Sequence, residues 1–168
     1  DPIPSRGLGD VYKRQVGRPH WPVSDEIWNR SNVLLQETME LAARENIPLQ
    51  LHVEGESDLT YGELARMADR AGLAREKLVR HYAPPRVDES YTHGLTPSVL
   101  AGSGSIDELM NTFESSSHGF MLETDYMDDP KRPGAVLGPK TVPKRTRQLL
   151  EAGSVSYTHL TLPTTLSV

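Results

Sequence analysis

The sequence predicts an α/β fold with parallel strands, and more narrowly the C-terminal half of a (β/α)8 TIM barrel. Short apolar runs alternate with helical patterns, and several of these runs end abruptly in polar side chains. Alternation of this kind produces right-handed βαβ units and a parallel sheet. The 168 residues are too few for a complete barrel of about 250 residues, and four strand–helix units with polar strand ends fit half of one. A flavodoxin-like sheet is the competing fold.

Both ends of the chain read as translated sequencing adapter. Back-translation of Asp10–Gln15 gives a DNA whose opposite strand encodes, in another frame, Val-Ser-Tyr-Thr-His, and residues 155–159 have this sequence. We therefore expect residues 1–15 and 154–168 to be non-native tails that pack poorly and take no part in the fold. Residues 16–153 then form one partial-barrel domain.

The composition limits the classes of partner. The tails hold three of the 18 basic and two of the 23 acidic residues, so residues 16–153 are mildly acidic, with 15 basic and 21 acidic. This balance argues against a broad nucleic-acid-coating surface and is compatible with a local phosphate site. The absence of cysteine excludes disulfides and thiolate metal sites. No run approaches the roughly 18 apolar residues of a membrane span. We expect a cytoplasmic protein with no membrane contact and no stable protein partner.

The first elements follow from capping and periodicity. Val16-Gly17 is expected to be the end of a strand. Ser24 is a good helix N-cap, and its helix carries apolar residues at helical period through about Glu45. Asn46-Ile47-Pro48 ends this helix, and a strand follows over residues 48–54.

The remaining elements repeat this order. A helix capped by Ser57 or Asp58 runs to Gly72, and a strand follows over residues 77–82. Residues 83–97 form a long loop with three prolines, which suggests more than a simple connection. The last elements are expected to be a strand over 98–101, a helix capped by Ser105 through Phe113, a strand over 119–126, and a helix from Thr141 or Pro143 to Gly153.

Three of the predicted strands end in side chains that bind metals. These residues are His52, His81 and Asp125. Because the carboxyl ends of parallel strands meet at one rim, we expect the three side chains to share it. Imidazole and carboxylate ligands suit Zn, Mn or Mg, and a metal ion can lower the pKa of water enough for hydrolysis near neutral pH. The alternative is a non-catalytic α/β module in which these side chains are hydrogen-bonded polar groups of the core.

The strand-end motifs resemble those of a known family. Leu51-His52-Val53-Glu54, Arg80-His81-Tyr82 and Leu122-Glu123-Thr124-Asp125 are similar to strands five, six and eight of the TatD-like metal-dependent hydrolases of the amidohydrolase superfamily. Residues 126–143 resemble an archaeal branch of that family. The resemblance implies that the chain is the C-terminal half of a (β/α)8 TIM barrel, strands five to eight with their helices. It also implies metal-assisted hydrolysis of phosphodiesters in DNA, or of a related ester or amide in a small molecule. A lactonase or deaminase of the same superfamily is the alternative.

The same resemblance assigns roles to individual residues. His52 and His81 would bind the metal, and Asp125 would bind it and also act in catalysis, by activating water or protonating the leaving group. Members of the family also carry a histidine pair from the first strand and a glutamate from the fourth, and neither is found here. We therefore expect the fragment to bind metal weakly and to be inactive by itself.

Five further residues are candidates for supporting roles. Glu54 and Glu123 are expected to support the metal ligands from behind, although for Glu123 a hydrogen bond inside the barrel is equally open. His20, beyond the first strand, and His93, in the long loop, are candidate substrate contacts. Lys140 belongs to a basic cluster at the start of the last helix that could hold phosphate, or could simply be a solvated face.

Overall fold

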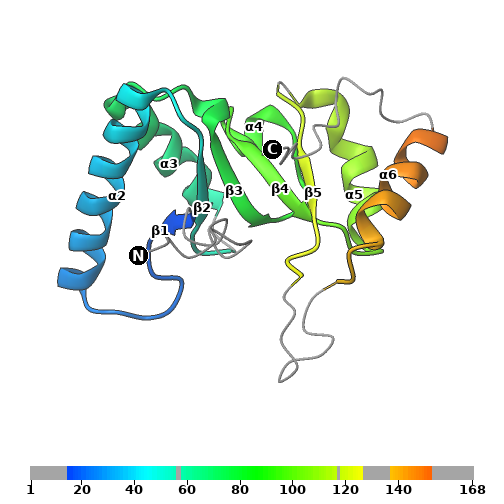
Figure 1. The fold of residues 1–168 in the computed structure, drawn as a ribbon, viewed down its shortest axis with the longest axis horizontal. Helices are drawn as coiled ribbons and strands as arrows, with labels where there is room; N and C mark the ends of the chain where they lie inside the picture. The colour runs from blue at the N-terminus through cyan, green and yellow to red at the C-terminus, as the bar shows by residue number, and fades with distance from the viewer. Residues whose placement is uncertain (1–14, 56–57, 117, 127–136, 153–168) are drawn as a thin grey trace, which may run out of the picture.

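The computed structural model describes residues 15–55, 58–116, 118–126 and 137–152 (Figure 1). Within this part of the chain, five strands form one parallel sheet in the order β1-β2-β3-β4-β5. Sequential order is the order used by a (β/α)8 barrel, whereas a flavodoxin-like sheet places its first strand between later ones. The predicted parallel α/β fold is therefore confirmed. The strands are β1 (Gln15–Gly17), β2 (Leu49–His52), β3 (Leu78–Ala83), β4 (Thr96–Leu100) and β5 (Met121–Glu123).

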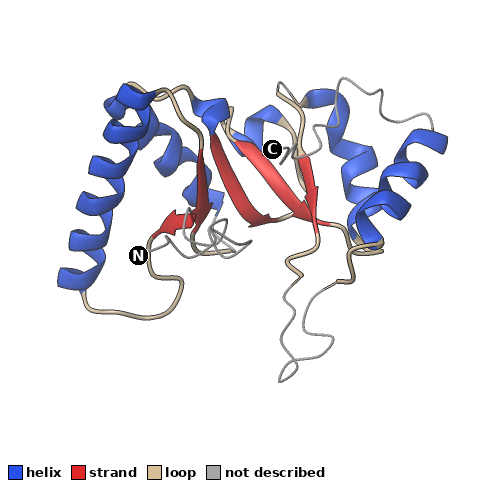
Figure 2. Cartoon of the chain, in the orientation of Figure 1, coloured by secondary structure: helices blue, strands red, loops and turns tan. Residues whose placement is uncertain are grey.

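The helices form an outer arc around the sheet, with α2 and α3 at one end and α5 and α6 at the other (Figures 1 and 2). None of the helices in the described ranges is long and apolar enough to span a membrane. The helices are α2 (Asp25–Glu45), α3 (Asp58–Ala71), α4 (Glu89–Thr92), α5 (Ser105–Thr112) and α6 (Thr141–Glu151), with short 3-10 turns η1 (Arg75–Lys77) and η2 (Phe113–Ser115).

The ends of α2 are set by the residues that the sequence indicates. Ser24 has an extended backbone, and its hydroxyl accepts a hydrogen bond from the amide of Ile27 at 3.4 Å. Asn46 closes the helix in the left-handed conformation, with φ of 56°. Helix α3 ends in the same manner one residue before Gly72, whose φ is 70°. Local capping chemistry thus fixes the lengths of the two helices that cover β2 and β3.

The core consists of two apolar clusters on the helix side of the sheet. One joins β2 and the start of β3 to α2 and α3, and it includes Leu35, Met39, Leu51, Leu64 and Leu78. The other joins β4 and β5 to α5, η2 and α6, and it includes Val99, Leu109, Phe113, Leu122 and Leu149. On each strand the next residue points to the opposite face. That face carries the polar side chains Gln50, His52, His81, Ser98 and Glu123.

A glycine allows β1 to pair with β2. Gly17 lies opposite His52 in the parallel register, and the amide of Arg18 donates to the carbonyl of His52 at 3.3 Å. A Cβ atom built on Gly17 would lie 1.7 Å from that carbonyl oxygen. No side chain fits this gap, so glycine is required here. Gln15, which the sequence assigns to a tail, is the first residue of β1 and pairs with Gln50.

Several predicted boundaries differ from the structure. The loop over residues 83–97 contains the short helix α4, whose N-cap is Asp88. Ser105 is the first residue of α5 instead of its cap, because its hydroxyl donates to the carbonyl of Leu100 at 2.8 Å. Strand β5 stops at Glu123, since Asp125 turns out of the strand with φ of 47°. The rest of the predicted tails lies outside the described residues.

Candidate functional site

The carboxyl ends of the strands bring His52, His81 and Asp125 together at one rim. The His52 and His81 rings lie with their centroids 5.5 Å apart, on the adjacent strands β2 and β3. Nε2 of His81 lies 3.4 Å from Oδ1 of Asp125, which follows β5. His20, in the loop after β1, joins the same group, with its ring centroid 4.6 Å from that of His52. Four residues from four parts of the chain thus meet at one edge of the sheet.

Glu123, at the end of β5, hydrogen-bonds three groups of this rim. Its Oε2 lies 2.9 Å from Nδ1 of His81 and accepts a hydrogen bond from the hydroxyl of Ser98 at 2.5 Å. Its Oε1 accepts the backbone amide of Tyr82 at 2.8 Å. A carboxylate on Nδ1 fixes the rotation of the imidazole ring and directs Nε2 outward. His81 is therefore held between two carboxylates, with Glu123 behind it and Asp125 in front.

The pKa values of His52 and His81 are shifted in opposite directions. Burial works against protonation of His81, but the hydrogen bond that its Nδ1 donates to Glu123 and the charges of Glu123 and Asp125 together outweigh it, so the pKa of His81 is raised. Burial lowers the pKa of His52, and the neighbouring His20 and His81 lower it further. Near neutral pH, His52 is thus a neutral imidazole, the form that can bind a metal ion.

The donor types at the rim suit a divalent cation. Nε2 of His81 and a carboxylate oxygen of Asp125 face each other, with a second carboxylate on the far ring nitrogen, an arrangement common around metal-binding histidines. Across the described ranges, no set of three or more His, Asp or Glu side chains is arranged to hold a metal ion. The residues therefore fit a cation as two adjacent donors with His52 beside them, and not as a complete ligand shell.

A hollow opens above these side chains. It has a volume of about 460 Å³, and its lining residues are His20, His52, Val53, Glu54, Gly55, His81 and Tyr82. It therefore lies on three successive segments, from the loop after β1 to the end of β3. A substrate held there would contact the imidazole groups directly.

Glu54 does not hydrogen-bond a histidine; it pairs with a buried arginine. The guanidinium of Arg18 binds both carboxylate oxygens of Glu54, the carboxylate of Glu63 at 2.7 Å, and Oδ1 of Asn32 at 2.9 Å. Thr60 adds a hydroxyl donor to Glu54 at 3.0 Å. The expected support of the ligands by Glu54 is thus indirect: the pair fixes the segment between β2 and α3, just after His52.

Two candidate contacts, His93 and Lys140, are not among the described residues that line the hollow at the rim. His93 ends α4, just before β4 begins, and its ring lies in the helix layer, where a Cβ on Gly62 would be 3.3 Å from its Nε2. His93 lies at the amino end of β4, whereas the rim is formed by the carboxyl ends of the strands. Lys140 is exposed at the start of α6. The nearby Leu137 amide bonds the carbonyl of Thr124, which leaves Lys140 three residues from a segment adjoining Asp125.

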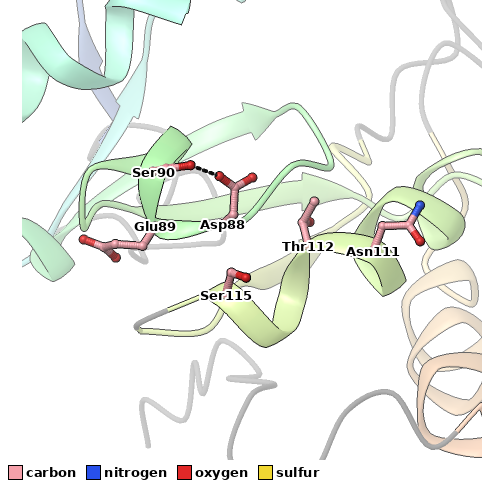
Figure 3. Close-up of a pocket in the computed structure, with 6 residues that line it drawn as sticks. All are labelled: Asp88, Glu89, Ser90, Asn111, Thr112 and Ser115. Atoms are coloured by element: carbon pink, nitrogen blue, oxygen red, sulfur yellow. Dashed lines mark hydrogen bonds between the residues drawn. The ribbon is translucent and has the colours of Figure 1, made fainter.

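A larger hollow lies elsewhere, between α4 and the α5 region (Figure 3). It has a volume of about 640 Å³ and is lined by polar residues, of which Asp88 and Thr112 stabilise the local fold. Asp88 caps α4 by accepting from the amide of Tyr91 at 3.1 Å. Thr112 donates to the carbonyl of Glu108 and accepts from the amide of Val87. Among the described residues that line this hollow there is no histidine, and Asp88 and Thr112 are bonded to backbone groups of the fold.

Sequence reasoning missed Arg18, Ser98 and the backbone role of Tyr82. Arg18 follows Gly17 in a segment that reads as a loop, and its partners lie 14, 36 and 45 residues away. Ser98 lies on the predicted strand 98–101, and strand alternation would have placed it on the face opposite to Val99. Tyr82 gave no local signal, because a tyrosine at a strand end is ordinary.

Comparison with known proteins adds family evidence to this geometry. The chain matches the family model described as TatD related DNase over residues 15–166. It is also 42% identical over 139 residues to an uncharacterised protein, MJ1127, of Methanocaldococcus jannaschii. That alignment covers 83% of this chain and 48% of the archaeal protein. The chain therefore spans about half the length of the curated relative that it matches.

Proposed function

Because the chain belongs to the family of TatD-related DNases, we propose that it is part of a metal-dependent hydrolase that cleaves phosphodiester bonds in DNA. The observation that carries the proposal is the row Glu123, His81 and Asp125, with separations of 2.9 Å at Nδ1 and 3.4 Å at Nε2. A related ester or amide in a small molecule is the broader substrate class.

In this proposal, His52, His81 and Asp125 hold a divalent cation, Zn, Mn or Mg. The ion, when bound, would polarise the scissile phosphoryl group and lower the pKa of water. Glu123 keeps Nε2 of His81 directed outward by occupying Nδ1. His52 presents a neutral imidazole because its pKa is lowered. Oδ1 of Asp125, which lies 3.4 Å from Nε2 of His81, would accept a proton from water and return it to the leaving oxygen.

The complete activity is proposed for a protein longer than this chain. The chain covers 48% of its archaeal relative, and its described residues supply no complete ligand shell. We take β2 to β5 as strands five to eight of a barrel and β1 as the end of the strand before them. The other half of the barrel would bring the remaining ligands. The chain alone is then inactive toward DNA but retains weak cation binding.

Cation binding by the chain is the first test. Titration with Mn²⁺, followed by electron paramagnetic resonance, is expected to show one weak site that Asp125→Asn removes. Asp69→Asn is the matched control, because Asp69 pairs with Arg75 on an exposed surface. If Mn²⁺ does not bind, or binds equally well to Asp125→Asn, the proposed role fails and the rim is a cluster of structural hydrogen bonds.

Hydrolysis is the second test. The chain joined to the other half of the archaeal relative is incubated with a labelled oligonucleotide and Mn²⁺, Mg²⁺ or Zn²⁺. Metal-dependent cleavage that disappears in the Asp125→Asn chimera is the expected result. A folded, metal-loaded chimera that cleaves no phosphodiester or ester would contradict the proposed reaction.

A further inference from the structure

Tyr82 has a backbone conformation that does not belong in a strand. Its φ is 52°, and the pairing of β3 with β4 shifts register between Arg80 and Ala83. A bulky residue in the left-handed region is strained, and such strain persists only where the surroundings enforce it. The consequence is that the Tyr82 ring leaves the regular strand pattern and is 55% exposed.

Glu123 is the group that enforces this conformation. Its Oε1 accepts the amide of Tyr82 at 2.8 Å, while its Oε2 contacts Nδ1 of His81 at 2.9 Å. The backbone amide of Tyr82 is thus bound by the Glu123 side chain and not by the neighbouring strand. One carboxylate therefore sets both the orientation of an imidazole and the outward turn of the next residue.

The Tyr82 ring ends a row of five rings across the rim. Ring centroids are 4.8 Å apart for Trp21 and His20, 4.6 Å for His20 and His52, 5.5 Å for His52 and His81, and 6.1 Å for His81 and Tyr82. The three inner rings are imidazoles. The two outer rings, Trp21 and Tyr82, are 59% and 55% exposed, although aromatic residues of this size are usually well buried. The imidazole groups therefore lie between two exposed aromatic rings.

The charges around this hollow favour stacking over phosphate contacts. Of the seven described residues that line it, none is Lys or Arg. The nearby Arg18 is buried and already bound to Glu54, Glu63 and Asn32. Nucleic acids bind proteins chiefly through cations at phosphates or through aromatic rings under bases. The described lining thus offers no Lys or Arg side chain to phosphates, whereas it does offer an exposed aromatic ring.

The geometry points to Tyr82 as a stacking platform for a nucleobase next to the reactive imidazoles, with Trp21 as a second platform at the other end of the row. This inference rests on the proposed function, since it concerns the same hollow and a nucleic-acid substrate. Glu123 is then a positioning residue for the platform as well as for His81.

Binding without hydrolysis tests the inference. The full chain is titrated, in the absence of divalent metal, with a fluorescently labelled decathymidylate and with an abasic oligonucleotide of the same length, using anisotropy. The expected result is that wild type prefers the base-bearing strand, that Tyr82→Phe keeps this preference, and that Tyr82→Leu weakens base-bearing binding about tenfold without changing abasic binding. Tyr82→Gly removes the ring and also relieves the left-handed strain, so it gives a folded, ring-free protein should the leucine variant unfold.

The outcomes separate this inference from the proposed function. Equal binding of the two strands by wild type, or equal loss for both strands in Tyr82→Leu and Tyr82→Gly, would overturn the platform. Asn46→Gly, which relieves left-handed strain at a helix end remote from the rim, is the control and is expected to bind like wild type. Base-dependent binding that needs the Tyr82 ring supports the platform even if no hydrolysis is ever observed.

Discussion

Replacement of Arg18 by methionine probes the buried network that connects the first strand to two helices. The guanidinium donates to Glu54, Glu63 and Asn32, and its central carbon lies 4.5 Å from the centre of the Trp28 ring. Methionine keeps the apolar stem and removes every one of these interactions. The carboxylate of Glu54 is then left with the Thr60 hydroxyl as its remaining side-chain donor in the described network.

The size of the effect follows from the exposure of the partners. The Arg18 side chain is 1% exposed, whereas those of Glu54 and Glu63 are 24% and 43% exposed. Removing one member of a fully buried pair costs about 3–5 kcal/mol. Water reaches these carboxylates, so we reduce this to about 2 kcal/mol, and the lost cation–π contact adds roughly 1 kcal/mol. We therefore expect the free energy of unfolding to fall by about 3 kcal/mol.

Urea unfolding followed by circular dichroism measures this loss, with Arg75→Met as the matched control. Arg75 forms an equally close pair with Asp69, but its side chain is 41% exposed. An exposed pair contributes about 1 kcal/mol or less, so the control is expected to lose no more than that. Both substitutions replace Arg by Met, one in a buried network and one at an exposed pair that also includes the His93 carbonyl. The difference between them therefore measures the contribution of the buried network.

The pH dependence supplies a second readout. Burial acts to raise the pKa of Glu54, but the hydrogen bond and charge of Arg18, together with the hydrogen bonds from a backbone amide and from Thr60, outweigh it, so the pKa lies below its ordinary value of 4.5. A carboxyl group with a lowered pKa stabilises the fold above pH 4.5, and this contribution disappears as the pH falls through the folded-state pKa. The cost of Arg18→Met should therefore be largest above about pH 5 and shrink below it. A cost equal to that of Arg75→Met, or a cost independent of pH, would refute the reasoning.

Three further predictions follow from single contacts. Gly17→Ala should lower the free energy of unfolding by about 3 kcal/mol or more, because its Cβ would lie 1.7 Å from the His52 carbonyl oxygen. Gly55→Ala is the control, because a Cβ there meets nothing within 4 Å. Equal stability of the two variants would contradict the β1–β2 pairing. Asp88→Ala should cost about 1 kcal/mol at neutral pH through loss of the α4 cap. Burial acts to raise the pKa of Asp88, but the contacts with Arg86 and Ser90 together outweigh it, so the pKa is lowered. The cost of Asp88→Ala should therefore vanish as the pH falls below 3.8. An undiminished cost in urea unfolding at low pH would argue against the cap. Glu123→Gln should lower the pKa of His81 in an NMR titration and weaken Mn²⁺ binding by about 10–100-fold, whereas an unchanged His81 titration would show that Glu123 does not hold this ring.

Local signals in the sequence were sufficient for the regular elements. Ser24 and Asn46 mark the two ends of α2, and they could be recognised because capping depends on neighbours within four residues. The apolar runs before His52 and His81 predict strands for the same reason. Helix α4 was missed, since its four residues are too short for a periodic pattern, and its cap, Asp88, sits in a segment dominated by prolines.

The site was predictable in outline only. Parallel strands bring their carboxyl ends together, so the prediction that His52, His81 and Asp125 lie close followed from topology, and the structure places them side by side. Their role as metal ligands stays a prediction. The Arg18 network depends on contacts up to 45 residues apart, which no local pattern encodes.

The backbone gives evidence about the rim that does not depend on side-chain type. Four non-glycine residues among those described have positive φ: Asn46, Tyr82, His93 and Asp125. Asn46 and His93 end helices, where a left-handed residue is the usual way to stop. Tyr82 and Asp125 end no helix, and both adjoin His81, one through sequence and the other through its carboxylate. Strain of this kind costs free energy and collects at functional sites, so positive φ values on both sides of one imidazole support the proposal that His81 lies at the centre of the site.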